Sequence, residues 1–167
     1  MIKPITIGLF GTCGGSTWRD PFMAAYARNG IGYFNPQVDD WTTEMAEIEA
    51  QHLVEDDIIL FPVTGETAGL GSLAETGFSM FQAMKTNMNR YFVFMVDDEC
   101  DPLKVLDPVL TKESRRARAL VRAHLRKNQH PNVFVCGDLD QMLLVSLMLH
   151  RSLTYINRAR GVLENGA

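Results

Sequence analysis

Short apolar runs and amphipathic stretches alternate along the whole chain. Each apolar run is rich in β-branched or aromatic residues and has the length of a buried strand. These runs cover residues 5–10, 31–36, 57–63, 91–96 and 132–136. The stretches between them predict helices over residues 18–28, 42–55, 72–87 and 112–128, and a last helix from about Asp138 into the 150s. This alternation predicts an α/β fold with a doubly wound, five-stranded parallel sheet and helices on both faces.

The chain has 167 residues, a length typical of one domain with a single core, and it contains no repeat, linker or low-complexity segment. We therefore expect residues 1–167 to form a single domain of the Rossmann-like or flavodoxin-like kind. In such sheets a ligand binds at the carboxyl ends of the strands. Four predicted loops should meet at that edge, over residues 11–17, 35–41, 64–72 and 97–101.

Composition and charge narrow the classes of partner. The formal net charge of −4 gives no general attraction to a nucleic-acid polymer or an anionic membrane. No apolar run is long enough to span a membrane, and the short run at the N-terminus lacks the features of a signal peptide. Cys13, Cys100 and Cys136 are widely spaced, and the four His residues show no metal-ligand spacing. These features predict a cytoplasmic protein with reduced thiols, no metal and no cofactor.

The loop after the first predicted strand, "GLFGTCGGSTWRDPF" over residues 8–22, is rich in glycine. It lacks the Lys of a Walker A phosphate loop and the Gly-x-Gly-x-x-Gly fingerprint of a dinucleotide site. Cys13 and Arg19 have the Cys-x5-Arg spacing of the low-molecular-weight tyrosine phosphatases, which this loop resembles. In such a site a thiolate attacks phosphorus while the Arg binds phosphate oxygens. Asp20 stands where that family has Ser or Thr and would repel the substrate, so a cysteine phosphatase is kept as an alternative.

A second resemblance involves more of the chain. The segments "GTCGGSTWRD", "YFNPQVDDW", "DDIILFPVT" and "GLGSLAETGFSM" occur in this order over about residues 5 to 100. They resemble the nucleoside 2-deoxyribosyltransferase-like family. The resemblance implies an enzyme that cleaves the N-glycosidic bond of a nucleoside through a covalent glycosyl-enzyme intermediate, which is passed to water or to a second base. It also implies a homo-oligomer in which a neighbouring subunit completes each site.

The resemblance assigns the catalytic residues. Glu75 matches the Glu that attacks the anomeric carbon, and it should lie in the first turn of the helix over 72–87, where the helix start favours an ionised carboxylate. Asp57 matches the Asp that opens the third strand of the family, and we expect it to relay a proton to the departing base. The family also has an Asp six residues before the nucleophile that binds the sugar hydroxyls. Gly69 occupies that position in this chain.

The predicted binding residues come from the same four loops. Small residues after the first strand should form a floor for a flat base, with Trp18 and Trp41 stacking on it or walling the pocket. The full predicted set is Gly11, Thr12, Gly14, Gly15, Trp18, Arg19, Asn35, Asp40, Trp41, Gly69, Gly71 and Ser72.

Two further features bear on substrate and assembly. Ser114 and Arg115 begin a strongly basic helix and are candidates for binding a 5′-phosphate, which would make the substrate a nucleoside 5′-monophosphate. The Met- and Phe-rich stretch over 77–88 has more apolar surface than one sheet face requires, so we expect it to form a subunit interface. Because Gly69 replaces the sugar-binding Asp, a nucleotide-binding module without catalysis is the alternative on the same fold.

Overall fold

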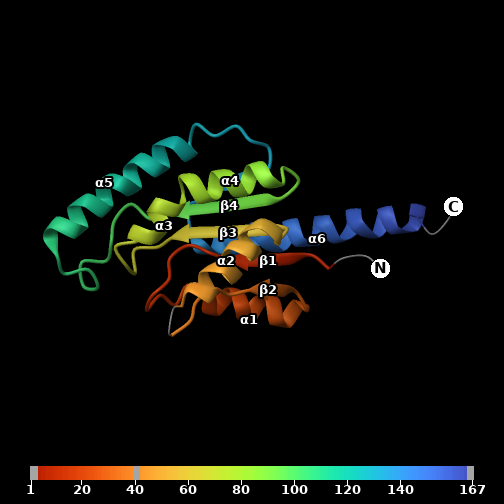
Figure 1. Cartoon of the computed structure of the whole chain (residues 1–167), viewed down its shortest axis with the longest axis horizontal. Coiled ribbons are helices and arrows are strands. Elements are labelled where there is room, and N and C mark those ends of the chain that lie inside the picture. The colour runs from red at the N-terminus through yellow and green to blue at the C-terminus, as the bar shows by residue number, and fades with distance from the viewer. Residues whose placement is uncertain (1–3, 40–41, 165–167) are drawn as a thin grey trace.

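The computed structural model describes residues 4–39 and 42–164. Within these residues five strands form one sheet in the order β2-β1-β3-β4-β5, and every neighbouring pair is parallel (Figure 1). The strands are β1 (Thr6–Leu9), β2 (Gly32–Phe34), β3 (Ile58–Val63), β4 (Tyr91–Val96) and β5 (Val133–Val135). The predicted α/β fold with a five-stranded parallel sheet is therefore confirmed.

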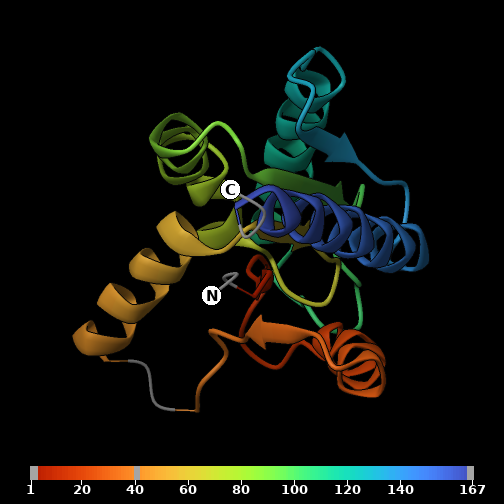
Figure 2. The same cartoon turned by 90° about the vertical axis from the view of Figure 1, so that its right-hand side faces the viewer.

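Six helices connect the strands in the described part of the chain. They are α1 (Arg19–Asn29), α2 (Thr43–Glu55), α3 (Leu70–Glu75), α4 (Phe78–Thr86), α5 (Pro108–Leu125) and α6 (Leu139–Glu164). Figure 2 shows α1 and α6 on one side of the sheet and α2 and α4 on the other. Two apolar clusters correspond to these sides: Leu60 packs with Phe22 of α1 and Met142 of α6, whereas Phe61 packs with Met80 of α4. The sheet is doubly wound, as the alternation of elements predicts.

All five strands end at the same edge of the sheet, and the loops that follow them meet there. The loop after β1 is held against the end of β3 by backbone contacts. Gly11 has a φ of +89°, and a Cβ at this position would collide with the carbonyl oxygen of Pro62, so only glycine fits. Next to it, the amide of Thr12 donates to the Pro62 carbonyl at 2.9 Å, and the amide of Thr64 donates to the Thr12 hydroxyl at 2.8 Å.

The helix expected over 72–87 is instead two helices. The short helix α3 ends at Glu75, and α4 begins at Phe78. At the break Gly77 has φ −81° and ψ −95°, outside the helical region, and the Thr76 hydroxyl donates to the Leu73 carbonyl at 2.7 Å. Glycine is a poor helix former, and a local hydroxyl bond competes with the helical ladder, so this dipeptide divides the segment.

Two other helices are longer than expected. Helix α5 begins at Pro108 because the Asp107 carboxylate accepts hydrogen bonds from the amides of Val109 and Leu110, at 2.8 and 3.0 Å. Helix α6 has 26 residues, and its carboxyl-terminal half extends past the amino ends of the strands (Figure 1). None of the described helices is both long enough and apolar enough to cross a membrane.

Candidate active site

A cleft of about 590 Å³ lies between the loops that follow β1, β2 and β3 and the helices α2 and α3. It is at the carboxyl edge of the sheet, where the fold predicts a ligand site. Six of the predicted site residues line it: Gly11, Gly14, Gly69, Gly71, Ser72 and Glu75. The structure therefore brings these six residues together around one cleft.

Glu75 lies in this cleft but not where the sequence placed it along its helix. It is the last residue of α3, so the expectation that a helix start favours its ionised form is wrong. The carboxyl end of a helix carries partial negative charge and disfavours a carboxylate. Burial, together with the nearby carboxylate of Glu49, raises the pKa of Glu75 to about 7. Near neutral pH the group is therefore divided between its acid and carboxylate forms.

Glu49 is a cleft residue that the sequence interpretation missed. It projects from α2, on the opposite side of the cleft from α3, and it is half-buried. Burial raises the pKa of Glu49, and the guanidinium of Arg19 opposes this rise. One sequence signal could have found it: Glu49 is spaced four residues from both Met45 and Leu53, on the half-buried face of α2. A charged residue on such a face needs a structural or chemical reason.

Arg19 lies fully buried behind the cleft wall and contacts Cys13, which is half-buried and lines the cleft. The Arg19 side chain has no exposed surface, and it donates from Nε to the Leu9 carbonyl at 2.8 Å and from Nη1 to the Thr12 carbonyl at 2.6 Å. Its Nη2 donates to Sγ of Cys13 at 3.3 Å. Burial raises the pKa of the Cys13 thiol despite this Arg. A phosphatase needs a thiolate and an Arg free to bind phosphate, so the geometry does not favour that alternative.

Three residues expected to contact the base lie behind the loop instead. Thr12 is fully buried, and its hydroxyl donates to the Pro62 carbonyl of β3 and accepts from the Thr64 amide just after β3. Trp18 is 3% exposed, packs edge-on against Phe22 at 5.2 Å between ring centroids, and donates from Nε1 to the Thr12 carbonyl at 2.9 Å. Together with Arg19, Thr12 and Trp18 stabilise the conformation of the loop after β1. Their predicted direct contact with a base is corrected accordingly.

The remaining predicted residues of the first two loops are Gly15, Asn35, Asp40 and Trp41. Gly15 is exposed and does not line the cleft. The Asn35 carboxamide oxygen accepts from the Gln37 amide at 3.0 Å, which shapes the turn, and Gln37 Nε2 donates to the Gly14 carbonyl at 2.6 Å. Asn35 therefore affects the cleft only indirectly, because it fixes the turn that positions Gln37. Asp40 and Trp41 lie outside the described residues.

Asp57 is at the opposite edge of the sheet from the cleft. It immediately precedes β3, and its carboxylate accepts a hydrogen bond from the Thr6 amide at 2.9 Å. The six residues of β3 separate it from the loop that carries Gly69, a distance of about 20 Å at the usual rise of a parallel strand. The prediction that Asp57 relays a proton at this site is therefore wrong for a single chain.

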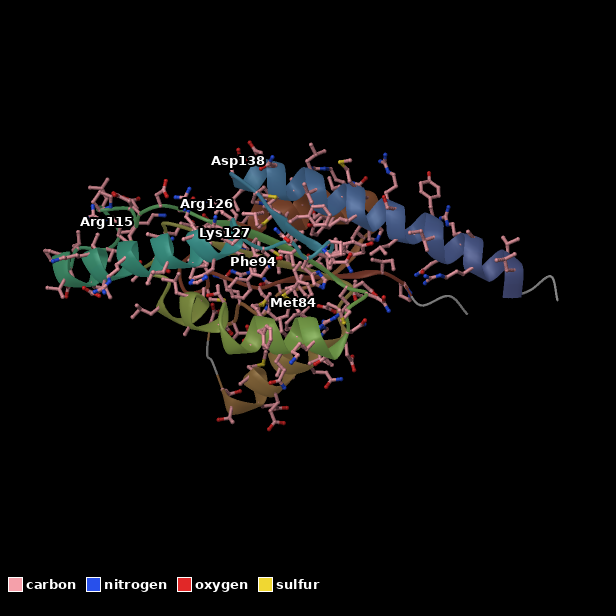
Figure 3. All side chains as sticks on the ribbon, turned by 90° about the horizontal axis from the view of Figure 1, so that it is seen from above. Met84, Phe94, Arg115, Arg126, Lys127 and Asp138 are labelled. Carbon is pink, nitrogen blue, oxygen red and sulfur yellow. The ribbon has the colours of Figure 1, made fainter. Side chains whose placement is uncertain are left out.

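Ser114 and Arg115 do not form a phosphate site. Ser114 is fully buried; its hydroxyl donates to the Ala68 carbonyl at 2.6 Å and accepts from Nε of Arg118 at 3.0 Å. Arg115 is exposed and pairs with Glu99 at 3.3 Å. Figure 3 shows Arg115 towards the outer end of α5, away from Phe94 in the sheet. The predicted phosphate-binding role of Ser114 is corrected, because its hydrogen-bonding capacity is used to fix the loop after β3.

The loop after β3 is shaped by a buried arginine. Arg118 of α5 has no exposed surface and donates to the carbonyls of Val63, Thr64 and Thr67 at 2.8, 2.9 and 3.0 Å. The chain wraps round the guanidinium and then turns into α3 at Gly69, whose φ is +67°. Arg118 was not identified from the sequence, where it reads as part of an exposed basic helix.

Glu66 joins the loops after β1 and β3. Its carboxylate accepts hydrogen bonds from the hydroxyl groups of Ser16, Thr17 and Thr64 and from the Thr17 amide. Although partial burial acts in the opposite direction, these bonds lower the pKa of Glu66 to about 2. These bonds occupy the acceptor atoms of Glu66, so this residue stabilises the two loops that border the cleft. No group of three His, Cys, Asp or Glu residues suited to a metal ion occurs among the residues described.

Fold and site together define an α/β domain of the flavodoxin-like kind with a carboxylate-bearing cleft at its switch point. No family model matches the sequence, and no curated protein matches it. The chain is similar in structure to the crystal structure of the RPS4 and RRS1 TIR domain heterodimer, with a TM-score of 0.55. The match covers 89% of this chain and 99% of that chain, at 9% sequence identity. At this identity the similarity shows the shared fold.

Proposed function

We propose that this protein is an enzyme that cleaves or transfers at the N-glycosidic bond of a nucleoside, deoxynucleoside or nucleoside 5′-monophosphate. The observation that carries this proposal is the position of Glu75, half-buried in a cleft of about 590 Å³ beside the glycines of the loop after β3. A volume in this range suits a small organic ligand. Gly71 has no atom within 4 Å of the place of a Cβ, so the wall beside Glu75 is open to a sugar ring.

In the proposed reaction the Glu75 carboxylate attacks the anomeric carbon. The new carbon–oxygen bond forms as the bond from that carbon to the base nitrogen breaks, and the base leaves with a proton. Water or a second base then attacks the same carbon and releases Glu75. Hydrolysis and transfer differ only in which of these acceptors reaches the intermediate. The resemblance of residues 5 to 100 to the nucleoside 2-deoxyribosyltransferase-like family supports this reaction class.

We also propose that the chain forms a homo-oligomer that covers exposed apolar side chains of α3, α4 and the turn after α4. Met80, one of the residues of the Met- and Phe-rich stretch, is buried in the core, but Phe81 and Met88 are 59% and 65% exposed. Leu70, on the cleft wall, is 59% exposed. Large exposed apolar side chains are typical of interaction surfaces when they form a contiguous patch. Three free cysteines favour a reducing compartment, and we propose a cytoplasmic location.

Chromatographic detection of free base tests the function. Purified protein is incubated with ribonucleosides, deoxyribonucleosides and their 5′-monophosphates, with and without an acceptor base. We expect base release that Glu75→Gln abolishes and that Glu47→Gln, the same charge change on the exposed face of α2, leaves intact. A new nucleoside formed from the acceptor base would identify a transferase. If the wild-type protein releases no base from any substrate, the proposed enzyme activity is wrong.

A nucleotide-binding module without catalysis is the second candidate. Two observations favour it, because each removes a carboxylate that catalysis in the resembled family uses. Gly69 supplies no carboxylate, and Asp57 is at the other edge of the sheet. This candidate predicts that a nucleotide binds equally well to wild-type protein and to Glu75→Gln, as measured by calorimetry, with no base released by either.

A further inference from the structure

A second carboxyl group, that of Glu49 on a different helix, lines the same cleft as Glu75 and interacts with it electrostatically. We propose that Glu49 is the proton donor to the departing base, and this inference rests on the proposed function. The family resemblance places that role on Asp57, which lies at the opposite edge of the sheet. Glu49 of α2 and Glu75 of α3 line the same cleft, and the negative charge of Glu49 contributes to the raised pKa of Glu75.

The position of Glu49 is fixed by the packing of α2. Leu53, one turn further along the helix, packs against the apolar cluster that includes Phe61 and Met80. The Thr42 hydroxyl accepts from the Met45 amide at 3.3 Å and caps the start of α2. An anchored helix therefore presents Glu49 to the cleft.

Four ionisable groups face one another at this site. They are Cys13 from the loop after β1, Arg19 from α1, Glu49 from α2 and Glu75 from α3. Burial raises the pKa of both carboxyl groups; Arg19 opposes the rise at Glu49, whereas Glu49 adds to the rise at Glu75. Two neighbouring carboxyl groups in a partly buried site resist ionising together. The two ionisations are therefore coupled, and the pair keeps a proton more readily than either carboxyl group would alone.

A pair with one proton has both forms that glycosidic cleavage needs. In the form of the pair that has the proton on Glu49, the Glu75 carboxylate forms the bond to the anomeric carbon, while Glu49 gives its proton to the base as the carbon–nitrogen bond breaks. The Glu49 carboxylate then takes a proton from the attacking water or acceptor base, and the carbon–oxygen bond to Glu75 breaks. Atoms and protons balance over the cycle, and both glutamates return to their starting forms.

Cys13 is a poorer donor although it lines the same cleft. Its Sγ donates to the Gly11 carbonyl at 3.4 Å and accepts from Arg19 at 3.3 Å, so the thiol is held on the loop. Burial also raises the pKa of this thiol from its already high ordinary value. The proton for the base must therefore come from the carboxyl pair.

Substrates that differ in their need for a proton test the role of Glu49. The base of 7-methylguanosine carries a positive charge and leaves without protonation, whereas guanine needs a proton donor. We expect Glu49→Gln to lower kcat for guanosine by about 10²- to 10⁴-fold, yet to leave cleavage of 7-methylguanosine within about tenfold of wild type. Glu75→Gln should lose both activities, and Glu47→Gln neither. For an enzyme confined to pyrimidines, uridine and 5-fluorouridine form the matched pair.

The outcomes separate this inference from the proposed function. If Glu49→Gln loses kcat equally on both substrates, or on neither, the proposed role of Glu49 is wrong. Base release by the wild-type protein would still support the proposed function in that case. No base release by the wild type from any substrate would overturn both. Wild-type kcat should fall as pH rises above about 7, as the shared proton is lost. An unchanged circular dichroism spectrum and melting temperature would show that each variant is folded.

Discussion

A Cβ atom at position 69 would lie 3.0 Å from Nη2 of Arg118. It would be equally close to Cγ1 of Val63, on the strand that leads into the loop. The nucleoside 2-deoxyribosyltransferase-like family, which the sequence resembles, has an Asp at this position, and here the buried guanidinium occupies the space that such a side chain would need. Because Arg118 holds the loop through three carbonyl groups, the glycine and the arginine form one structural unit.

Replacement of this glycine should destabilise the fold. Gly69→Ala places a side chain on backbone with a φ of +67° and against Arg118. We expect the free energy of unfolding to fall by about 1 to 3 kcal/mol. Urea denaturation measures it, with Gly71→Ala as the control, because a Cβ at Gly71 meets no atom within 4 Å. Equal stability of the two variants would contradict the strain at Gly69.

Arg118 should contribute far more to stability than another arginine on the same helix. Arg118→Met removes hydrogen bonds to the carbonyls of Val63, Thr64 and Thr67; the Val63 carbonyl keeps the Asp97 amide as a donor, whereas those of Thr64 and Thr67 lose the guanidinium donor. We expect a loss of about 2 kcal/mol or more in the free energy of unfolding. Arg115→Met, at an exposed position, should change it by less than about 1 kcal/mol. A thermal or urea unfolding series on both variants checks this, and similar losses would contradict it.

Glu75 should make the protein less stable as pH rises. Its pKa is about 7 in the folded protein and near 4.5 in the unfolded chain, so the folded state binds more protons between these values. Stability from this group is fully present below about pH 4.5 and is lost as pH rises through 7. Urea denaturation at pH 5.5 and pH 8 should show a decrease that is smaller in Glu75→Gln. A decrease of the same size in the variant would show that Glu75 is not the group responsible.

Cys13 should be dispensable for base release. Its thiol is held by the Gly11 carbonyl and Arg19, and burial raises its pKa. We expect Cys13→Ser to keep kcat within about tenfold of wild type, because the hydroxyl can make the same hydrogen bonds. Phosphate release from 4-nitrophenyl phosphate should be absent in both proteins. A phosphatase activity that Cys13→Ser abolishes would instead support the cysteine phosphatase alternative.

The fold could be predicted because its signals are local and strong. The β4 strand has the predicted bounds of 91–96, since a continuous apolar run between polar segments leaves few other choices. The helix break at Thr76 and Gly77 was missed because one glycine inside an amphipathic pattern is usually tolerated. That break moved Glu75 from the start of a helix to its end, which reverses the effect of the helix on its charge.

The site was predicted where it depends on loops and missed where it depends on packing. Gly11, Gly69 and Glu75 lie in the cleft because loops after parallel strands must meet at one edge. Asp57 precedes its strand and so belongs to the other edge, a consequence of parallel topology that the family resemblance obscured. Glu49 was overlooked among the exposed acids of α2, since only its position at the cleft in the folded chain distinguishes it. The burial of Trp18 likewise follows from contacts across the core rather than from its own loop.

The most direct test of the central claim is to trap the covalent intermediate. Wild-type protein is mixed with a deoxynucleoside that releases base, quenched in acid and digested, and the peptides are examined by mass spectrometry. We predict a deoxyribosyl adduct on the peptide that contains Glu75, located on this residue by fragmentation and missing from Glu75→Gln. An adduct on another residue, or rapid base release with no adduct at any time before the steady state, would contradict Glu75 as the nucleophile.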